Sequence, residues 1–365
     1  MAPDSRHSRC FPEPTSPDPT PARRGETTGS WLARSTWIRA VECRRFYDSN
    51  LAALPEDAAD ALCARLRCDR LQAAHFELVV GRFLQVLGAE ELRYEVPGTE
   101  GASVDWVAVF ADGAVSVEAT APAVNAVIGA AVTAAGPIMD LLLEIAPPGW
   151  HPMVVRGPQL APTEPRRWLR RRLEGLLTEV PPPAGVPHEI ELQLENGLLQ
   201  ISLLPASDPT MRPDDVTGPF VGYIDDTSDV VHRAVAGKRR QARGATKPVL
   251  AAVYAAGFGD DEIEKFDIAL FGRTVVHQGR SEVSIDRSGV FGKGEGEPTF
   301  AGALAFAGLG WRGGPDPVLY IHPRFTGHLP EAIASLRTRT LSAVAIDDTP
   351  ARSKGALQQL GWPTS

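Results

Sequence analysis

The sequence contains little cysteine and no long apolar run. Its few cysteines form no C-x-x-C pair and have no histidine partner, which argues against zinc and favours reduced thiols. No stretch of 18 or more apolar residues occurs, so no membrane span is expected. The N-terminus lacks the apolar core of a signal peptide, so we expect a cytoplasmic protein. The four cysteines are Cys10, Cys43, Cys63 and Cys68.

Several familiar catalytic motifs and an excess of positive charge are also missing. The chain has no G-x-S-x-G, no H-E-x-x-H and no Rossmann glycine fingerprint. Its 37 Lys and Arg residues face 45 Asp and Glu residues, which gives a formal net charge of −8. Because the nucleic-acid backbone is negatively charged, any contact with it must come from local basic patches.

The composition that remains is that of a globular protein. Of its 365 residues, 43% are hydrophobic and 22% are charged, which is ample to build a core. Segments with strand patterns alternate with helical ones and with hairpins. This order predicts an α/β fold with a mixed central sheet flanked by helices, an N-terminal helical cap and additional hairpin strands.

The chain also divides by composition. Residues 1–28 are rich in Pro, Ser, Thr and Arg with little to bury, which predicts a disordered tail. A single domain is expected over 29–350, with a polar tail at 351–365. Within the domain we expect N-terminal helices (29–88), a core (71–145 and 228–271) and an inserted or appended helix–hairpin region (160–226).

Periodicity places the individual elements. Apolar residues at helical spacing predict helices over 31–48, 55–68, 71–87, 122–136, 163–178, 228–243 and 259–271. A short strand is expected after Gly88. Alternating or short apolar runs predict further strands over 103–110, 114–120, 138–145, 188–194, 198–204, 248–254, 318–321 and 341–346. The segments 205–226 and 279–298 are expected to be loops.

Three carboxylates fall where these elements meet. Glu77 lies on the helix over 71–87, and Asp105 and Glu118 lie on the two strands that follow. The dipeptide Asp112-Gly113 is typical of a hairpin turn, so Asp105 and Glu118 are expected to lie close together across paired strands. Clustered carboxylates suit a hard cation such as Mg²⁺. Taken singly, each is more often a solvated or turn residue than a functional one.

The order of these acids resembles that of the PD-(D/E)XK, or restriction-endonuclease-like, superfamily. That pattern has a helical Glu, an Asp on a second strand and a Glu-x-Lys at the end of a third, followed by a helix. The segments Phe46-Tyr47-Asp48 to Leu87-Gly88, Lys238-Arg239-Arg240-Gln241 and Lys247-Pro248-Val249-Leu250 also resemble a group of uncharacterised actinobacterial proteins with this core. The resemblance covers residues 45–350.

The resemblance implies a metal-dependent nucleic-acid phosphodiesterase. In it, Glu77, Asp105 and Glu118 hold Mg²⁺ or Mn²⁺, which lowers the pKa of a bound water and neutralises phosphate charge. Val104 replaces the usual proline, and Thr120 stands at the lysine position. Threonine supplies no positive charge for a developing oxyanion. We therefore expect Lys238 to occupy that space, with Gln241 about one helical turn further on.

A catalytically inactive nuclease-fold protein that binds nucleic acid or a protein partner is the alternative. The basic segment 233–247 is predicted to contact phosphates, although a solvated helix face explains it equally well. The arginine cluster at 166–172 is a second such candidate, and an adaptor acting through its loops is a third function. The expected nucleic-acid contacts are Arg233, Arg239, Arg240, Gln241, Arg243 and Lys247.

Overall fold

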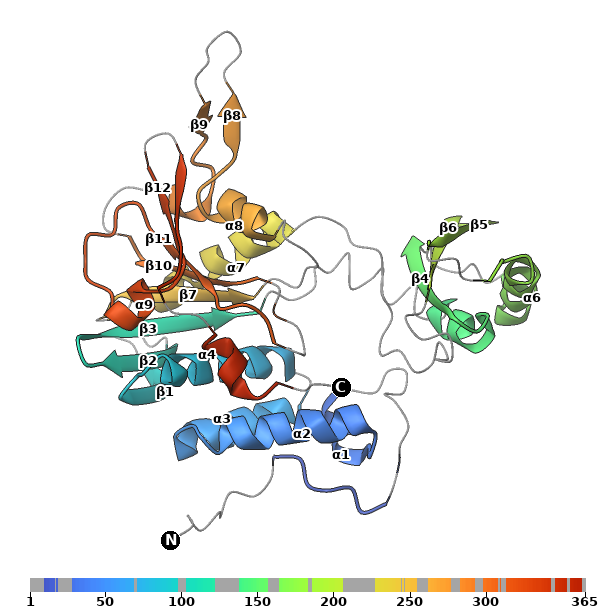
Figure 1. The fold of residues 1–365 in the computed structure, drawn as a ribbon, viewed down its shortest axis with the longest axis horizontal. Coiled ribbons are helices and arrows are strands. Elements are labelled where there is room, and N and C mark those ends of the chain that lie inside the picture. Colours follow the sequence, from blue (N-terminus) through green and yellow to red (C-terminus); the bar gives the residue numbers. More distant parts are fainter. Residues whose placement is uncertain are drawn as a thin grey trace. The chain divides into compact units, whose positions relative to one another are not determined.

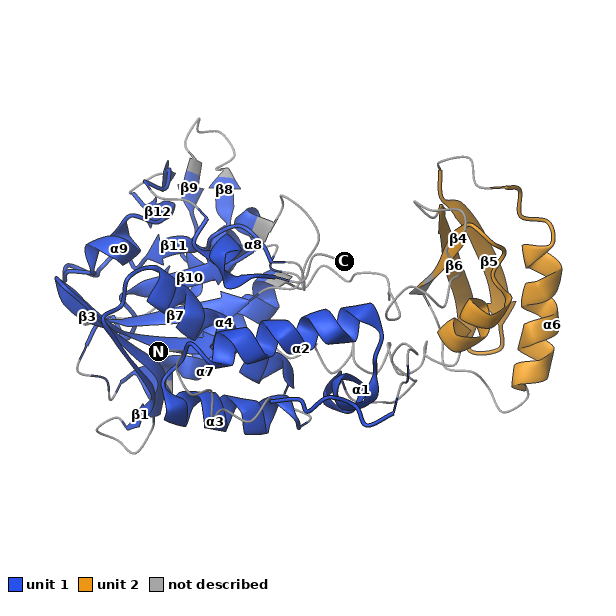
Figure 2. Ribbon diagram, turned by 60° about the horizontal axis from the view of Figure 1, so that its bottom comes forward, with its two compact units in different colours: residues 1–19, 27–122, 226–365 blue, residues 20–26, 123–225 orange. Residues whose placement is uncertain are grey.

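The computed structural model describes most of the chain and divides it into two compact units (Figure 2). Unit 1 comprises residues 1–19, 27–122 and 226–365, and unit 2 comprises residues 20–26 and 123–225. The described residues are 10–16, 18, 28–68, 71–97, 103–121, 138–156, 164–182, 186–205, 227–243, 245, 247–254, 262–276, 283–292, 298–307, 309, 313–342, 345–352 and 355–362.

An eight-stranded mixed sheet forms the centre of unit 1, in the order β1-β2-β3-β7-β10-β11-β12-β13 (Figure 1). Strands β1, β2 and β3 are antiparallel neighbours, and β7 then runs parallel to β3. The α/β class with a mixed central sheet is thereby confirmed. The strands are β1 (Glu91–Pro97), β2 (Ser103–Phe110), β3 (Gly113–Thr120), β7 (Val249–Tyr254), β10 (Gly302–Phe306), β11 (Val318–Ile321), β12 (Thr338–Leu341) and β13 (Ile346–Thr349).

Helices cover both faces of this sheet because its central strands are apolar on both sides. Along β7, Leu250 and Ala252 join the core beneath α1–α4, whereas Ala251 and Val253 join the core beneath α7 and α8. The helices are α1 (Thr28–Arg34), α2 (Ile38–Leu51), α3 (Glu56–Leu66), α4 (Leu71–Val86), α7 (Thr227–Ala242), α8 (Glu262–Leu270) and α9 (Glu331–Ala334).

Smaller elements complete unit 1. Strands β8 (Thr274–Val276) and β9 (Val283–Ile285) form a two-stranded sheet. Two short 3₁₀ helices, η2 (Val290–Gly292) and η3 (Leu357–Leu360), pack their apolar residues into the two cores. Within the described residues, no helix is both long and apolar enough to cross a bilayer.

Unit 2 has a core of its own. Its sheet has the order β4-β6-β5, formed by β4 (Trp150–Arg156), β5 (His188–Leu194) and β6 (Gly197–Pro205). Helix α6 (Arg166–Leu177) buries Leu169, Leu173 and Leu177, which recur every four residues and so share one face. The hairpin predicted around the Asn196-Gly197 turn is β5–β6.

Two strand predictions were wrong. Residues 138–145 form a helix, because Ile138, Leu141 and Leu142 are buried at helical rather than alternating spacing. The strand expected over 341–346 is not continuous: Leu341 ends β12 and Ile346 begins β13, and the described residues between them, Ser342 and Ala345, are joined by mutual hydrogen bonds. The helix expected over 122–136 lies entirely outside the described residues, and so does almost all of the loop expected over 205–226.

The N-terminal segment also differs from the disordered tail expected over 1–28. Cys10 and Phe11 are buried in the larger core, and the amide of Cys10 donates to Asp48. Cys10 forms a disulfide with Cys63 of α3, whereas the sequence predicted reduced thiols. Cys43 is a buried free thiol, as a small apolar side chain often is.

Candidate functional site

Two carboxylates meet on the face of the sheet that α7 covers. Trp106 of β2 pairs with Val117 of β3, and both point towards α4. Because side chains alternate along a strand, Asp105 and Glu118 point to the opposite face. The amide of Ala119 donates to Asp105 Oδ2 at 2.8 Å, which fixes the aspartate against β3.

Lys238 lies on α7, the helix that covers this face of the sheet, and its side chain extends to the two carboxylates. Its Nζ lies 3.0 Å from Glu118 Oε2 and 3.5 Å from Asp105 Oδ2. The Glu118 side chain is fully buried, while those of Asp105 and Lys238 keep 16% and 20% of their surface exposed. The structure therefore brings together three of the residues singled out in the sequence, at a site that solvent reaches through Asp105 and Lys238.

Burial dominates the electrostatics of the pair. Desolvation, reinforced by the charge of Asp105, raises the pKa of Glu118 to about 7, although Lys238 opposes the rise. Desolvation also raises the pKa of Asp105 against the opposing effect of Lys238. Burial disfavours the charged form of Lys238, but the two carboxylates outweigh it and raise its pKa. Lys238 is consequently an ammonium at neutral pH.

Replacing Glu118 with glutamine is expected to weaken the pH dependence of stability. The pKa of Glu118 is about 7 in the folded protein and 4.5 when unperturbed, so folding takes up protons between these values. The stabilisation is present below pH 4.5 and is lost as pH rises through 7, on the order of 3 kcal/mol in all. Urea unfolding at pH 5 and pH 8 measures it, with the exposed Glu331→Gln as the matched control. An unchanged difference between the two pH values in the Glu118 variant contradicts the assignment.

Glu77 does not join the two strand carboxylates. Its carboxylate accepts hydrogen bonds from Arg65 Nη2 and from the hydroxyl of Tyr94, each at 2.6 Å. Tyr94 pairs with Trp106 across β1 and β2 and shares its face, which is the side of α4. The sheet therefore separates the Glu77 carboxylate from Asp105, whose side chain points the other way.

The predicted phosphate-contacting residues have different surroundings. Arg233, Arg243 and Lys247 are exposed, whereas Gln241 is half-buried. Arg239 donates from Nη2 to the carbonyl of Val290 at 2.7 Å. The side chain of Arg240 lies outside the described part of the structure. The exposed cations form the accessible part of this basic segment.

The donor set suits a divalent cation in part. Within the described residues, no group of three His, Cys, Asp or Glu side chains is placed to hold a metal ion. Asp105 and Glu118 supply two carboxylates, and Glu118 Oε1 is buried without a hydrogen-bond partner. A buried, unpartnered carboxylate oxygen is costly unless something binds it, and oxygen is the ligand that Mg²⁺ and Mn²⁺ prefer. These two residues therefore fit a cation.

No family model, curated protein or solved structure matches this chain. The site must accordingly be interpreted from its own geometry and chemistry.

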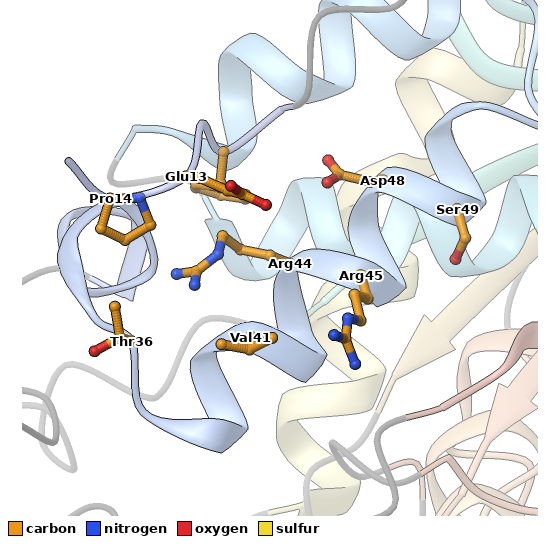
Figure 3. Close-up of a pocket in the computed structure, with 9 residues that line it drawn as sticks. Glu13, Pro14, Thr36, Val41, Arg44, Arg45, Asp48 and Ser49 are labelled. Carbon is orange, nitrogen blue, oxygen red and sulfur yellow. The ribbon is translucent and has the colours of Figure 1, made fainter. Parts of the chain in front are cut away.

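A separate cavity lies elsewhere in unit 1. It measures about 680 Å³ and opens between the N-terminal segment and α2 (Figure 3). Arg44 turns into it but donates to the carbonyls of Leu32 and Ser35, and Asp48 accepts from Cys10. These charged groups already hold the chain together, so this cavity is a structural feature rather than a second chemical centre.

Sequence reasoning missed the partners of Glu77. Arg65 lies on α3 and Tyr94 on β1, and neither belongs to the pattern of acids. Neither residue carries a local sequence signal, because only the packing of α3 and β1 against α4 brings them to Glu77. His75, two residues from Glu77, is half-buried beside Tyr47, and burial lowers its pKa to about 4.

Proposed function

We propose that this protein is a metal-dependent nucleic-acid phosphodiesterase with a restriction-endonuclease-like core. The observation that carries the proposal is the entry of Lys238 between Asp105 and Glu118, because it restores a positive charge missing at Thr120. The order of α4, the β1–β2–β3 meander and then α7 with β7 beside β3 supports the same core.

Asp105 and Glu118 are the residues that would hold the cation. When bound, Mg²⁺ or Mn²⁺ lowers the pKa of water and neutralises charge on a phosphate. Lys238 is kept protonated by the same two carboxylates, so it supplies a fixed positive charge where negative charge develops. Partial burial strengthens this contribution, since the surrounding dielectric is low.

A second candidate function is a non-catalytic nuclease-fold protein that binds nucleic acid or a protein partner. The observation that favours it is the ion pair itself. Lys238 lies within 3.5 Å of both carboxylates, so it neutralises the charge that a cation needs. In that case the three residues form a buried polar link between α7 and the sheet, and the exposed cations of 233–247 carry the binding.

Cleavage of plasmid DNA and of DNA or RNA oligonucleotides with Mg²⁺ or Mn²⁺ tests the first candidate. The unaltered protein is expected to cut at least one substrate, EDTA is expected to stop it, and Glu118→Ala is expected to be inactive. Circular dichroism confirms that the variant is folded. Absence of cleavage with every metal, together with no metal-induced rise in melting temperature, rejects the enzyme in favour of the binding protein.

A further inference from the structure

The described lining of a smaller cavity in unit 1 includes two arginines and no acidic residue. It measures about 380 Å³ and is bounded by the residues around η2, by the turn after β11 and by the end of β12. Arg287 and Arg324 are exposed and line it, and every other lining residue is uncharged. Its volume lies within the range of about 300–1,000 Å³ typical of small-molecule sites. This lining therefore favours a negatively charged ligand.

The segment that presents Arg287 is built tightly. Arg287 adopts a φ of +53°, a left-handed conformation that a side chain other than glycine rarely takes. Asp286 imposes it by accepting the amides of Arg273 and Ser288 at 2.9 and 2.8 Å. Gly292 lies so close that a Cβ there would stand 2.1 Å from the Arg287 carbonyl. An unusual backbone conformation held by its surroundings is a mark of functional sites.

The wall of the cavity formed after β11 carries positive charge. His322 precedes Pro323 and Arg324, and its ring lies 4.9 Å from that of Phe291. Burial, together with the charges of Arg324 and Arg239, lowers the pKa of His322 to about 4. Its Nδ1 accepts the amide of Arg324 at 3.1 Å, which suits the neutral ring. The neutral ring adds no charge of its own, so the positive charge of this wall comes from the arginines.

Helix α7 connects this cavity with the carboxylate site. Lys238 contacts Asp105 and Glu118, and the next residue, Arg239, donates to the carbonyl of Val290 in η2. Because successive helix residues point about 100° apart, one turn of α7 contacts both the carboxylate site and η2. Residues 290–292 are thus attached directly to the helix that carries the proposed catalytic lysine.

We propose that this cavity is a phosphate-binding subsite in which Arg287 and Arg324 hold a single phosphate group. Guanidinium groups match phosphate oxygens with paired N–H donors, which a point charge does not. The phosphate comes either from the backbone of a nucleic acid held at the carboxylate site or from a free phosphate ester. The first source rests on the proposed function, and the second does not.

Binding of inorganic phosphate, followed by calorimetry in EDTA, tests the subsite. The variants are Arg287→Gly, which suits the positive φ, Arg324→Gln, and the two combined. Arg93→Gln on β1 removes another exposed positive charge and serves as the control. The combined variant is expected to bind phosphate at least about tenfold more weakly, since two charged donors are lost. The control is expected to bind as the unaltered protein does.

Fluorescence anisotropy with a labelled oligonucleotide distinguishes the two sources. A nucleic-acid subsite predicts weaker oligonucleotide binding in the combined variant and a shallower salt dependence, by about one to two in log–log slope. Unchanged oligonucleotide binding beside lost phosphate binding identifies a free phosphate ester as the ligand. Phosphate binding that is absent in the unaltered protein, or equal in the combined variant, overturns the subsite.

These outcomes remain separate from the nuclease proposal. Glu118→Ala is expected to lose cleavage and keep phosphate affinity, because Glu118 does not line the cavity. A protein that never cleaves nucleic acid but binds phosphate through the two arginines supports the subsite and rejects the enzyme.

Discussion

Replacing Lys238 with methionine is expected to reduce metal-dependent cleavage by about 10²–10³-fold, the usual effect of removing one preorganised donor. Methionine keeps the length and the apolar stem of the side chain but removes the ammonium that lies 3.0 Å from Glu118. The fold is expected to persist, since Asp105 and Glu118 have raised pKa values and take up protons when the Lys238 ammonium is removed. Single-turnover cleavage with saturating enzyme measures the chemical step.

Two further variants make this result specific. Lys265→Met on α8 removes the same charge outside the site and is expected to cleave normally. Thr120 shares the face of Glu118 on β3, two residues further on, so Thr120→Lys places an ammonium on the same side of the sheet. Added to Lys238→Met, it is expected to restore part of the activity. Full activity in Lys238→Met alone would assign Lys238 a purely structural ion pair.

Strand geometry made the pairing of Asp105 with Glu118 predictable. The Asp112-Gly113 turn sets the register of β2 against β3, and alternation then decides which side chains share a face. Lys238 was a weaker inference because 120 residues separate it from Glu118. Only the parallel pairing of β3 with β7, which no local pattern specifies, brings α7 over the two acids.

Helical periodicity predicted α4 but did not reveal which of its faces meets the sheet, because α4 is buried on nearly every side. Along α4, residues from Phe76 to Gly81 are all buried, so the sequence does not reveal which of them face the sheet. Gly81 decides this by admitting the ring of Trp106, with which a Cβ would collide at 2.4 Å. That contact sets the rotation of α4 and, with it, the direction of Glu77. The side of the sheet that receives Glu77 was therefore not predictable.

Unit 2 illustrates the same limit in another form. The apolar run at 138–145 was interpreted as a strand because it is short and continuous, a pattern that buried helices share. Its burial at helical spacing appears only once α6 and the β4–β6–β5 sheet surround it. The hairpin β5–β6 was predictable because its turn residues and its alternation agree.

Replacing Arg65 with methionine is expected to destabilise the protein by about 3 kcal/mol, which is the cost of leaving one partner of a buried ion pair without its counter-charge. Glu77 keeps only 8% of its side chain exposed and would retain a single donor, Tyr94. Glu77→Gln is expected to cost less, because Arg65 is 27% exposed and can be hydrated. Urea unfolding of both single variants and of the double variant gives the coupling energy between them.

The same variants decide between the two roles of Glu77. If the glutamate is a clamp between α3, α4 and β1, Glu77→Gln lowers stability but preserves the rise in melting temperature caused by Mn²⁺. Asp105→Asn is expected to preserve stability but to lose the rise in melting temperature caused by Mn²⁺. The reason is that the Asp105 carboxylate lies beside Lys238 rather than within an arginine clamp. A Glu77→Gln variant that loses the metal-induced shift without losing stability would return Glu77 to the role that the superfamily resemblance implies. The arginine clamp would then have to open when the cation binds.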